Sequence, residues 1–364
     1  MLGSVAGIST DAIDTSPPTL DATQTEAEHR ALSDGCGLLD RSERGKLALS
    51  GAGAVEFLNG QVTNELADLV AGEGRYAAFL THKGKMLGDL RVLAVASQHR
   101  ASAGADGEPS LELLLDTERV ALQELFDMIR RFKVGYDVEL HKRTLESGLL
   151  SLIGPGAERV AGVDGAGAGD DPEAPSVALA AEEHANRRVE IEGVRALAIR
   201  TDVGIDLLCE SADTKRLRTA LLGRGAEPVS EAAAECVRIE RGRPRFGVDL
   251  DDSTIPQEAG LNERAVSFTK GCYVGQETVA RLFYKGKPNR HLRGLRLSAP
   301  AAPGAELHLG ERVVGRVGSV AISPTLGPIG LALVRREAEP GASVLVGEGR
   351  VTAEVVELPL AGSR

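Results

Sequence analysis

The stretch FTKGCYVGQETVARLFY occupies residues 268–284 and gathers chemical features that are scarce elsewhere in the chain. Cys272 follows Lys270 and Gly271, and Gly275 precedes a predicted short helix. A cation two residues away and a nearby helix N-terminus both favour the thiolate form of a cysteine. The two glycines allow the backbone to turn sharply and to approach a ligand closely. The pattern predicts a reactive cysteine; the alternative is an inert cysteine buried in a tight turn.

This stretch also resembles a family signature, K-G-C-Y-x-G-Q-E, of the YgfZ family, which are folate-binding proteins related to the glycine-cleavage T-protein. The matching positions are Lys270, Gly271, Cys272, Tyr273, Gly275, Gln276 and Glu277, and Arg281 follows them in the same predicted helix. Four other segments are similar to parts of that family: FLNGQVTNEL (57–66), THKGKMLGDLRV (81–92), RIERGRPRFGVDL (238–250) and IPQEAGL (255–261). The resemblance covers the chain from about residue 30 to its end.

The resemblance implies an α+β fold with three domains in a ring. Two mixed α/β domains and a C-terminal antiparallel β-barrel would surround a central channel that holds tetrahydrofolate or a one-carbon derivative. The implied function is an accessory protein for iron–sulfur cluster assembly or repair in client enzymes, including tRNA-modifying ones. Cys272 would be the functional thiol, with Lys270 beside it and at most a transient cluster. Folate and iron–sulfur client or assembly proteins are the implied partners.

The related T-protein suggests a second site and a second function, that of a folate-dependent aminomethyltransferase. Asp89 in GDLRV resembles an aspartate that lies near the reacting folate nitrogen in that enzyme, where a carboxylate would orient the nitrogen or stabilise a cation. The alternative is that Asp89 merely begins a strand. Asn64 is assigned to the folate-binding set together with Asp89. A third reading is a non-catalytic interaction module.

The T-protein's acidic pterin-holding motif, of the type G-Y-T-G-E, has no clean counterpart in this chain. The segment RTDVGIDLL at 200–208 offers only Asp202 or Asp206 in an approximate register. Asp206 is the predicted folate contact, although either residue could simply be exposed.

The composition of the 364-residue chain excludes several classes of function. Forty-two basic against 53 acidic residues give a net charge of −11, which opposes non-specific binding to nucleic acid. With no Trp, 4 Tyr and 7 Phe, the core must consist of Val, Leu, Ile and Ala. The four cysteines are scattered without zinc-like spacing, so neither a disulfide scaffold nor a metal site is predicted.

Charge is unevenly distributed, because residues 264–296 hold eight basic side chains and one acidic side chain, Glu277. This run either attracts an anion, such as the glutamate tail of folate, a phosphate or an acidic partner, or it is a solvated surface. The N-terminal sequence lacks a basic leader region, and no run of about 18 apolar residues occurs. A cytoplasmic location without membrane contact is therefore predicted.

The predicted domain boundaries follow the local sequence character. Residues 1–28 read as a disordered acidic tail, and residues 291–364 read as the barrel because short strands alternate there with Gly and Pro turns. Residues 29–145 together with 233–290 form the predicted folate-binding region. Residues 146–232 form a middle domain that carries a flexible insertion at 162–175.

Local patterns place several individual residues. Alternation in the predicted strand at 88–96 puts Asp89, Arg91 and Leu93 on one face. Asp116 or Thr117 is predicted to cap a helix that continues through Phe132, and Ser230 to cap one that continues through Arg241.

Overall fold

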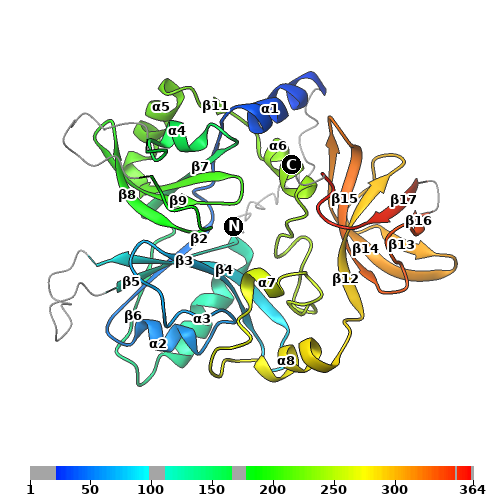
Figure 1. Ribbon diagram of the computed structural model, residues 1–364, viewed down its shortest axis with the longest axis horizontal. Helices are drawn as coiled ribbons and strands as arrows, with labels where there is room; N and C mark the ends of the chain where they lie inside the picture. The colour runs from blue at the N-terminus through cyan, green and yellow to red at the C-terminus, as the bar shows by residue number, and fades with distance from the viewer. Residues whose placement is uncertain (1–21, 98–110, 166–177, 349–350, 362–364) are drawn as a thin grey trace, which may run out of the picture.

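The computed structural model of this chain describes residues 22–97, 111–165, 178–348 and 351–361. Within them, two sheet-containing domains and a barrel surround a central segment of helix and loop (Figure 1). The predicted fold class is confirmed: both larger domains are mixed α/β, and the C-terminal domain is a closed antiparallel barrel. The predicted insertion at 162–175 lies mostly outside the described residues, as does most of the predicted tail.

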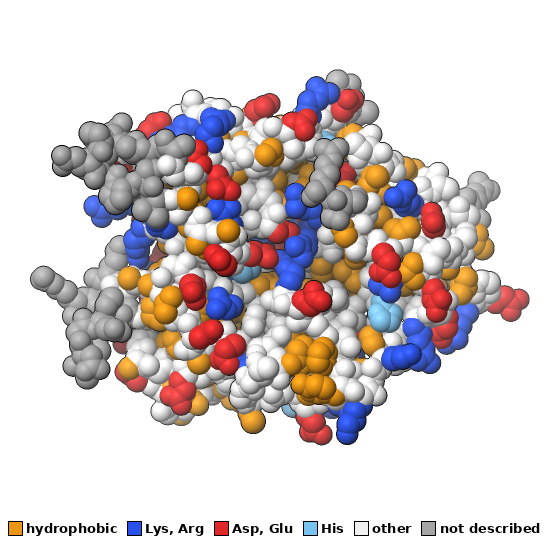
Figure 2. Space-filling view, in the orientation of Figure 1, with side chains coloured by type: hydrophobic (Ala, Val, Ile, Leu, Met, Phe, Trp, Pro, Cys, Tyr) orange, Lys and Arg blue, Asp and Glu red, His pale blue; other side chains and the backbone are white. Residues whose placement is uncertain are grey.

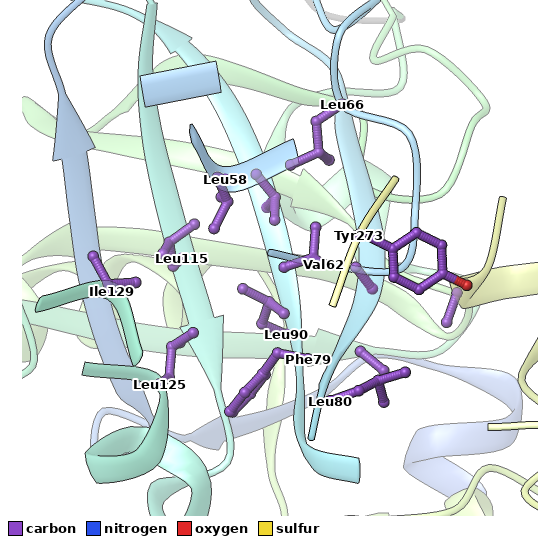
Figure 3. Packing of buried hydrophobic residues seen from close by; sticks show 14 of the residues in the cluster. Leu58, Val62, Leu66, Phe79, Leu80, Leu90, Leu115, Leu125, Ile129 and Tyr273 are labelled. Carbon is purple, nitrogen blue, oxygen red and sulfur yellow. The ribbon is translucent and has the colours of Figure 1, made fainter. Parts of the chain in front are cut away.

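The first domain is built on a five-stranded sheet in the order β3-β4-β5-β2-β6. Its strands are β2 (Gly45–Ser50), β3 (Gly74–Leu80), β4 (Met86–Ala96), β5 (Leu111–Thr117) and β6 (Glu139–Lys142), and its helices are α2 (Ala54–Asn59) and α3 (Leu122–Phe132). Leucine and alanine are the most frequent residues of its core, in which Phe57 and Phe79 are fully buried. Figure 3 shows Tyr273, from the cysteine-containing stretch, packed at the edge of this core near Val62 and Leu80.

The second domain is built on a six-stranded sheet in the order β11-β1-β7-β10-β9-β8. Its strands are β1 (Gly37–Asp40), β7 (Ser147–Ile153), β8 (Asn186–Ile191), β9 (Val194–Arg200), β10 (Gly204–Glu210) and β11 (Glu227–Pro228), and its helices are α4 (Ala157–Ala161) and α5 (Thr214–Gly223). Strand β1 pairs with β7 and β11. The chain therefore contributes a strand to the second sheet before it builds the first, which differs from the predicted boundary at residue 145.

Four further helices lie outside the two sheets: α1 (Ala22–Asp34) precedes β1, and α6 (Glu231–Glu240), α7 (Asn262–Ala265) and α8 (Gln276–Lys285) lie between β11 and the barrel. Helix α6 begins as predicted, because the Ser230 hydroxyl accepts a hydrogen bond from the Ala233 amide at 3.3 Å. Helix α1 begins inside the segment predicted as a tail. It is held by long-range contacts with α6, which local composition does not reveal.

The barrel closes in the strand order β12-β15-β14-β13-β16-β17. Its strands are β12 (Arg290–Leu297), β13 (Glu306–Leu309), β14 (Arg312–Ser323), β15 (Gly327–Arg335), β16 (Ser343–Val346) and β17 (Val351–Val356). Leu295, Val317 and Val355 are among the buried aliphatic side chains that fill its interior. Strands β14 and β15 pack on α6, so the barrel lies against the outer side of the central segment (Figure 1).

One predicted helix start is wrong. Asp116 and Thr117 end strand β5, and the following helix α3 begins only at Leu122. Asp116 pairs with arginines across the sheet instead of capping a helix, and this long-range pairing takes precedence over the local capping preference. None of the helices in the described parts of the chain is long and apolar enough to cross a membrane.

Candidate functional site

A cavity of about 210 Å³ lies at the centre of the molecule, between the two sheets and the segment that contains α6. Its lining residues come from both α/β domains and from α6 to α7, and none of the described barrel residues contributes. Figure 2 shows basic side chains gathered in the middle of this face, with acidic side chains beside them. The cavity is the natural place to test for a functional site, because converging polar groups meet there.

Asp89 on β4 lines this cavity and is almost fully buried. Strand register explains its main contact: Ala78 lies opposite Asp89, so Tyr76 on β3 is its diagonal neighbour on the same face. The Tyr76 hydroxyl donates a hydrogen bond of 2.7 Å to Asp89 Oδ2. The Thr117 hydroxyl donates one of 2.5 Å to the Asp89 carbonyl oxygen. Neighbouring strands therefore fix both the side chain and the backbone of Asp89.

Burial raises the pKa of Asp89 to about 6, opposed in part by the Tyr76 hydrogen bond, which favours the carboxylate. Among the described residues, no lysine or arginine forms an ion pair with Asp89. Asp89 is thus a carboxyl group that can gain or lose a proton near neutral pH and has one side-chain partner. A buried carboxyl group with a raised pKa in a cavity is typical of a functional site.

Most of the arginines around the cavity are paired with carboxylates, whereas Arg241 donates to the Asp202 backbone carbonyl oxygen. Arg91 lies opposite Asp116 in the β4–β5 pairing, and its Nε is 2.7 Å from Asp116 Oδ2. Its Nη1 reaches across to the second domain, 2.6 Å from Asp206 Oδ2. On α6, Arg238 is 2.9 Å from Asp249. These pairs stabilise the walls of the cavity and leave little unbalanced charge on them.

The other predicted folate contacts are held by neighbouring groups. Asp206 lines the cavity, but one oxygen pairs with Arg91 and the other accepts a 2.6 Å hydrogen bond from Ser151, its partner across the β7–β10 pairing. Asp202 also lines the cavity and pairs with Arg243. Asn64 is not among the residues that line the cavity. Its amide nitrogen donates hydrogen bonds to the carbonyl oxygens of Tyr76 and Arg264. Asn64 therefore connects β3 to α7.

The structure places Cys272 outside the cavity, on the surface just before α8. Lys270 is buried, and its ammonium donates to the carbonyl oxygens of Asn59, Val62 and Asn64 and to the Asn59 side chain, at 2.6–3.0 Å. Burial lowers the pKa of Lys270 to about 8. The hydrogen bonds of Lys270 thus attach the cysteine-containing stretch to the first domain and leave the thiol of Cys272 to solvent.

The remaining motif residues divide between structural and exposed positions. Tyr273 is a core residue whose pKa is raised by burial to about 12. Gly275 has φ of 86°, and a Cβ there would lie 2.6 Å from the Thr81 carbonyl oxygen, so this glycine permits a close approach within the chain. At Gly271 a Cβ would meet nothing within 4 Å, which contradicts the predicted need for glycine. The side chains of Glu277 and Arg281 are exposed. The Gln276 side-chain nitrogen donates a hydrogen bond of 3.4 Å to the Gly271 carbonyl oxygen.

The basic run at 264–296 does not form one surface. Arg264 lines the central cavity, Lys270 is buried, and Arg290 and Arg293 pair with Glu258 and Glu357. The exposed members include Arg281, Lys285 and Lys287. The positive charge counted in the sequence is therefore divided among separate environments.

Tyr76 and His184 are among the cavity-wall residues that sequence reasoning missed. Tyr76 could have been found by extending the alternation of β4 to the preceding strand, because Tyr76 lies opposite Arg91. His184 precedes β8 in a segment without periodicity or motif, so no sequence signal identifies it.

In the described parts of the chain, one group of three potential metal ligands lies within 4.8 Å: His29, Cys236 and Glu240. These residues join α1 to α6 and are buried. His29 Nε2 is 3.0 Å from Glu240 Oε1, and the Ser323 hydroxyl donates to the same oxygen at 2.5 Å. Burial raises the pKa of the Cys236 thiol, which opposes the thiolate a metal needs. We interpret the group as a hydrogen-bonded clamp between helices.

This clamp predicts a pH-dependent contribution to stability. The hydrogen bond to Glu240 raises the pKa of His29 above 6.5, so the contribution is complete below that pH and is lost as pH rises through the raised value. The pKa of Glu240 is lowered from 4.5, against burial, by its bond to His29, so on the acid side stability is lost as pH falls through the lowered value. We expect His29→Gln to destabilise the protein on the order of 1 kcal/mol near pH 6 and less at pH 9.

Urea unfolding from pH 5 to 9 measures this difference. The matched control is His82→Gln, because His82 is exposed. A difference between wild type and His29→Gln that stays constant with pH would contradict the assignment.

Comparison with known proteins places this geometry in a family context. The chain matches the GCVT N-terminal domain over residues 17–270 and the glycine cleavage T-protein C-terminal barrel domain over residues 290–361. It is 31% identical over 341 residues to an aminomethyltransferase from Rubrobacter xylanophilus, covering 92% of this chain and 85% of that protein. An aminomethyltransferase from Geobacillus kaustophilus is 30% identical, over 91% of this chain and 89% of that protein.

A solved structure agrees with these matches. The structure of glycine cleavage system aminomethyltransferase T from Bartonella henselae has a TM-score of 0.77 and 25% identity to this chain, covering 93% of this chain and 90% of its own. The main functional prediction, a YgfZ-type accessory factor for iron–sulfur assembly and tRNA modification, is therefore wrong, because the similar proteins reported above are aminomethyltransferases. The T-protein resemblance, which supplied the alternative function, is the part that these matches support.

Proposed function

This chain belongs to the glycine cleavage T-protein family, and from that premise we propose that it is a tetrahydrofolate-dependent aminomethyltransferase. The donor in this proposal is an aminomethyl group carried on the lipoyl arm of a carrier protein. Asp89 carries the proposal, because it is a buried carboxyl of raised pKa in the central cavity, at the position where the sequence resembles the T-protein.

The cavity fits the ring end of tetrahydrofolate better than the whole molecule. Its volume of about 210 Å³ is below the roughly 300–1,000 Å³ typical of pockets that enclose a complete drug-sized ligand. Tyr76 places an aromatic ring in the cavity wall. The arginines of the wall, such as Arg91 and Arg264, are paired with carboxylates, so the net charge of the wall is small. The pterin ring would lie inside this cavity, and the glutamate end would extend outward.

When bound, tetrahydrofolate supplies the nitrogens that accept the one-carbon unit, so the carbon–sulfur bond breaks to leave the lipoyl thiol and the carbon–nitrogen bond breaks to release ammonia. A carboxyl group with a pKa of about 6 is mostly ionised at neutral pH. The negative charge of Asp89 therefore stabilises positive charge that develops on a reacting nitrogen, and Asp89 accepts a proton from it. Tyr76 keeps the carboxylate in place through its 2.7 Å hydrogen bond. The surrounding sheets exclude water from Asp89, which strengthens its electrostatic effect.

An assay with purified components tests the proposal. The protein is mixed with tetrahydrofolate and a lipoyl carrier protein loaded with an aminomethyl group, and ammonia and methylenetetrahydrofolate are measured. We expect both products in equal amounts, with formation of methylenetetrahydrofolate requiring both the protein and the folate. Absence of protein-dependent turnover with the loaded carrier would overturn the proposal.

A further inference from the structure

His184 lies in the wall of the central cavity, and neither of its ring nitrogens has a hydrogen-bond partner in the described parts of the chain. The residue is only 5% exposed. Six buried side-chain nitrogen and oxygen atoms lack partners in those parts, and three of them belong to His184 and Arg264, which both line this cavity. Buried polar atoms are normally hydrogen-bonded, so unpartnered atoms on one cavity wall indicate a site that a ligand completes.

The backbone holds His184 in an unusual conformation. Its φ is 72°, in the left-handed region that most side chains avoid. Glu192, with φ of 49°, also lies in this region, but it occupies the two-residue turn between β8 and β9, where positive φ is common. His184 occupies the third position of a β-turn that the Ala185 amide closes on the Glu182 carbonyl oxygen at 3.0 Å, where positive φ is also common, so this turn fixes the backbone of His184 at the cavity wall.

Contacts from both domains fix this conformation. The His184 amide donates to the Arg200 carbonyl oxygen at 2.9 Å, which attaches it to the second sheet. On the side of the first sheet, a Cβ at Gly74 would lie 2.7 Å from both Cβ and the carbonyl oxygen of His184. The glycine therefore permits the close approach of β3 to His184. The imidazole is thus presented to the cavity by rigid elements.

The imidazole is uncharged at neutral pH. Burial, assisted by the positive charges of Arg91 and Arg264, lowers the pKa of His184 to about 3. A neutral imidazole offers one N–H donor and one lone pair as acceptor. The nearest acidic oxygen, Glu183 Oε1, is 3.7 Å from His184 Nε2, beyond hydrogen-bond length, and Glu183 pairs with Arg264.

Tyr76 connects His184 to the reactive side of the cavity. The rings of Tyr76 and His184 are 6.3 Å apart, and the Tyr76 hydroxyl binds Asp89. Arg91 and Asp206 form an ion pair with each other, so they are not available to hydrogen-bond a ligand.

We propose that His184 recognises the pterin ring of the bound folate by hydrogen bonding to an uncharged N–H or C=O group on the edge of the ring. This inference rests on the proposed function. An uncharged imidazole suits such a group, which carries no net charge and offers alternating donors and acceptors. Binding would satisfy nitrogens that have no partner in the described chain, so no existing hydrogen bond of the ring is lost.

Calorimetry with 5-formyltetrahydrofolate, 6-hydroxymethylpterin and p-aminobenzoylglutamate tests the assignment. We expect His184→Phe, which keeps a ring of similar shape, to weaken binding of the first two ligands about 10- to 100-fold and to leave the third unchanged. His184→Asn keeps a donor and an acceptor and tolerates positive φ, so we expect most of the affinity to be retained. The matched control is Glu192→Gly, which changes the other residue of positive φ outside the cavity.

The outcomes separate the two proposals. Wild-type protein that binds none of the three ligands would overturn the proposed function, and with it this inference. Wild-type protein that binds 5-formyltetrahydrofolate as tightly as His184→Phe does would overturn the role of His184 alone. Equal loss of pterin and p-aminobenzoylglutamate binding in His184→Phe would also overturn it, because that result indicates a distorted cavity. Nitrogen NMR of the imidazole gives an independent reading, since we expect the His184 ring signals to shift when 5-formyltetrahydrofolate is added.

Discussion

Asp89→Asn is expected to lower the rate of aminomethyl transfer about 100- to 10,000-fold, the range found when a positioned acid–base or charge-stabilising group is removed. Asparagine has the shape of aspartate and can still accept the Tyr76 hydrogen bond, so the cavity keeps its geometry. What the variant lacks is the negative charge and the site for a proton. Binding of 5-formyltetrahydrofolate should change far less than turnover.

The pH dependence of Asp89 gives a second measurement on the same variant. With a pKa of about 6, wild-type Asp89 becomes protonated as pH falls through that value, and we expect the rate to fall with it. The Asn variant should lack this dependence. Because the folded-state pKa lies above the usual 3.8, this group's contribution to stability is complete below about 3.8 and is lost as pH rises through about 6. Asp89→Asn should therefore be at least as stable as wild type at pH 8.

The matched control for this comparison is Asp127→Asn, a surface substitution on α3 of the same chemical kind. It should leave turnover and its pH profile unchanged. An Asp89→Asn variant with wild-type turnover would remove Asp89 from the reaction.

Local periodicity predicted much of the first domain correctly. The alternation at 88–96 placed Asp89 and Arg91 on one face, and both residues line the central cavity. The Ser230 cap and the antiparallel barrel were also confirmed, because capping and short alternating strands depend on nearby residues. By contrast, the membership of β1 in the second sheet depends on pairing with β7 and β11, more than a hundred residues away along the chain.

The candidate site was less accessible to sequence reasoning. The pattern around Cys272 is specific, but the bonds of Lys270 go to Asn59, Val62 and Asn64, more than two hundred residues away along the chain. Lys270 is only two residues from Cys272 in the sequence, but this proximity did not predict that its ammonium group is directed to the first domain. The position of His184 in the cavity wall depends on its contacts with β3 and β9. No local sequence pattern predicts these contacts.

Arg91→Met is expected to lower the free energy of unfolding by about 3–5 kcal/mol, because it removes one partner of a buried charge network. Arg91 pairs with Asp116 on the first sheet and with Asp206 on the second, and both pairs are largely buried. Without Arg91, Asp116 keeps its pair with Arg44, whereas Asp206 keeps only the Ser151 hydroxyl. The cost therefore arises mainly from an uncompensated carboxylate at the contact between the two domains.

Urea unfolding of Arg91→Met, Asp206→Asn and the double variant measures this coupling. The double variant should be more stable than Arg91→Met alone, since it removes the carboxylate that lost its partner. Arg143→Met provides the control, because Arg143 pairs with Glu146 at the surface, where such pairs contribute about 0–1 kcal/mol. If Arg91→Met costs no more than Arg143→Met, the ion pairs of Arg91 do not hold the two sheets together, and the apolar contact between Leu93, Leu197 and Ile199 would carry that interface instead.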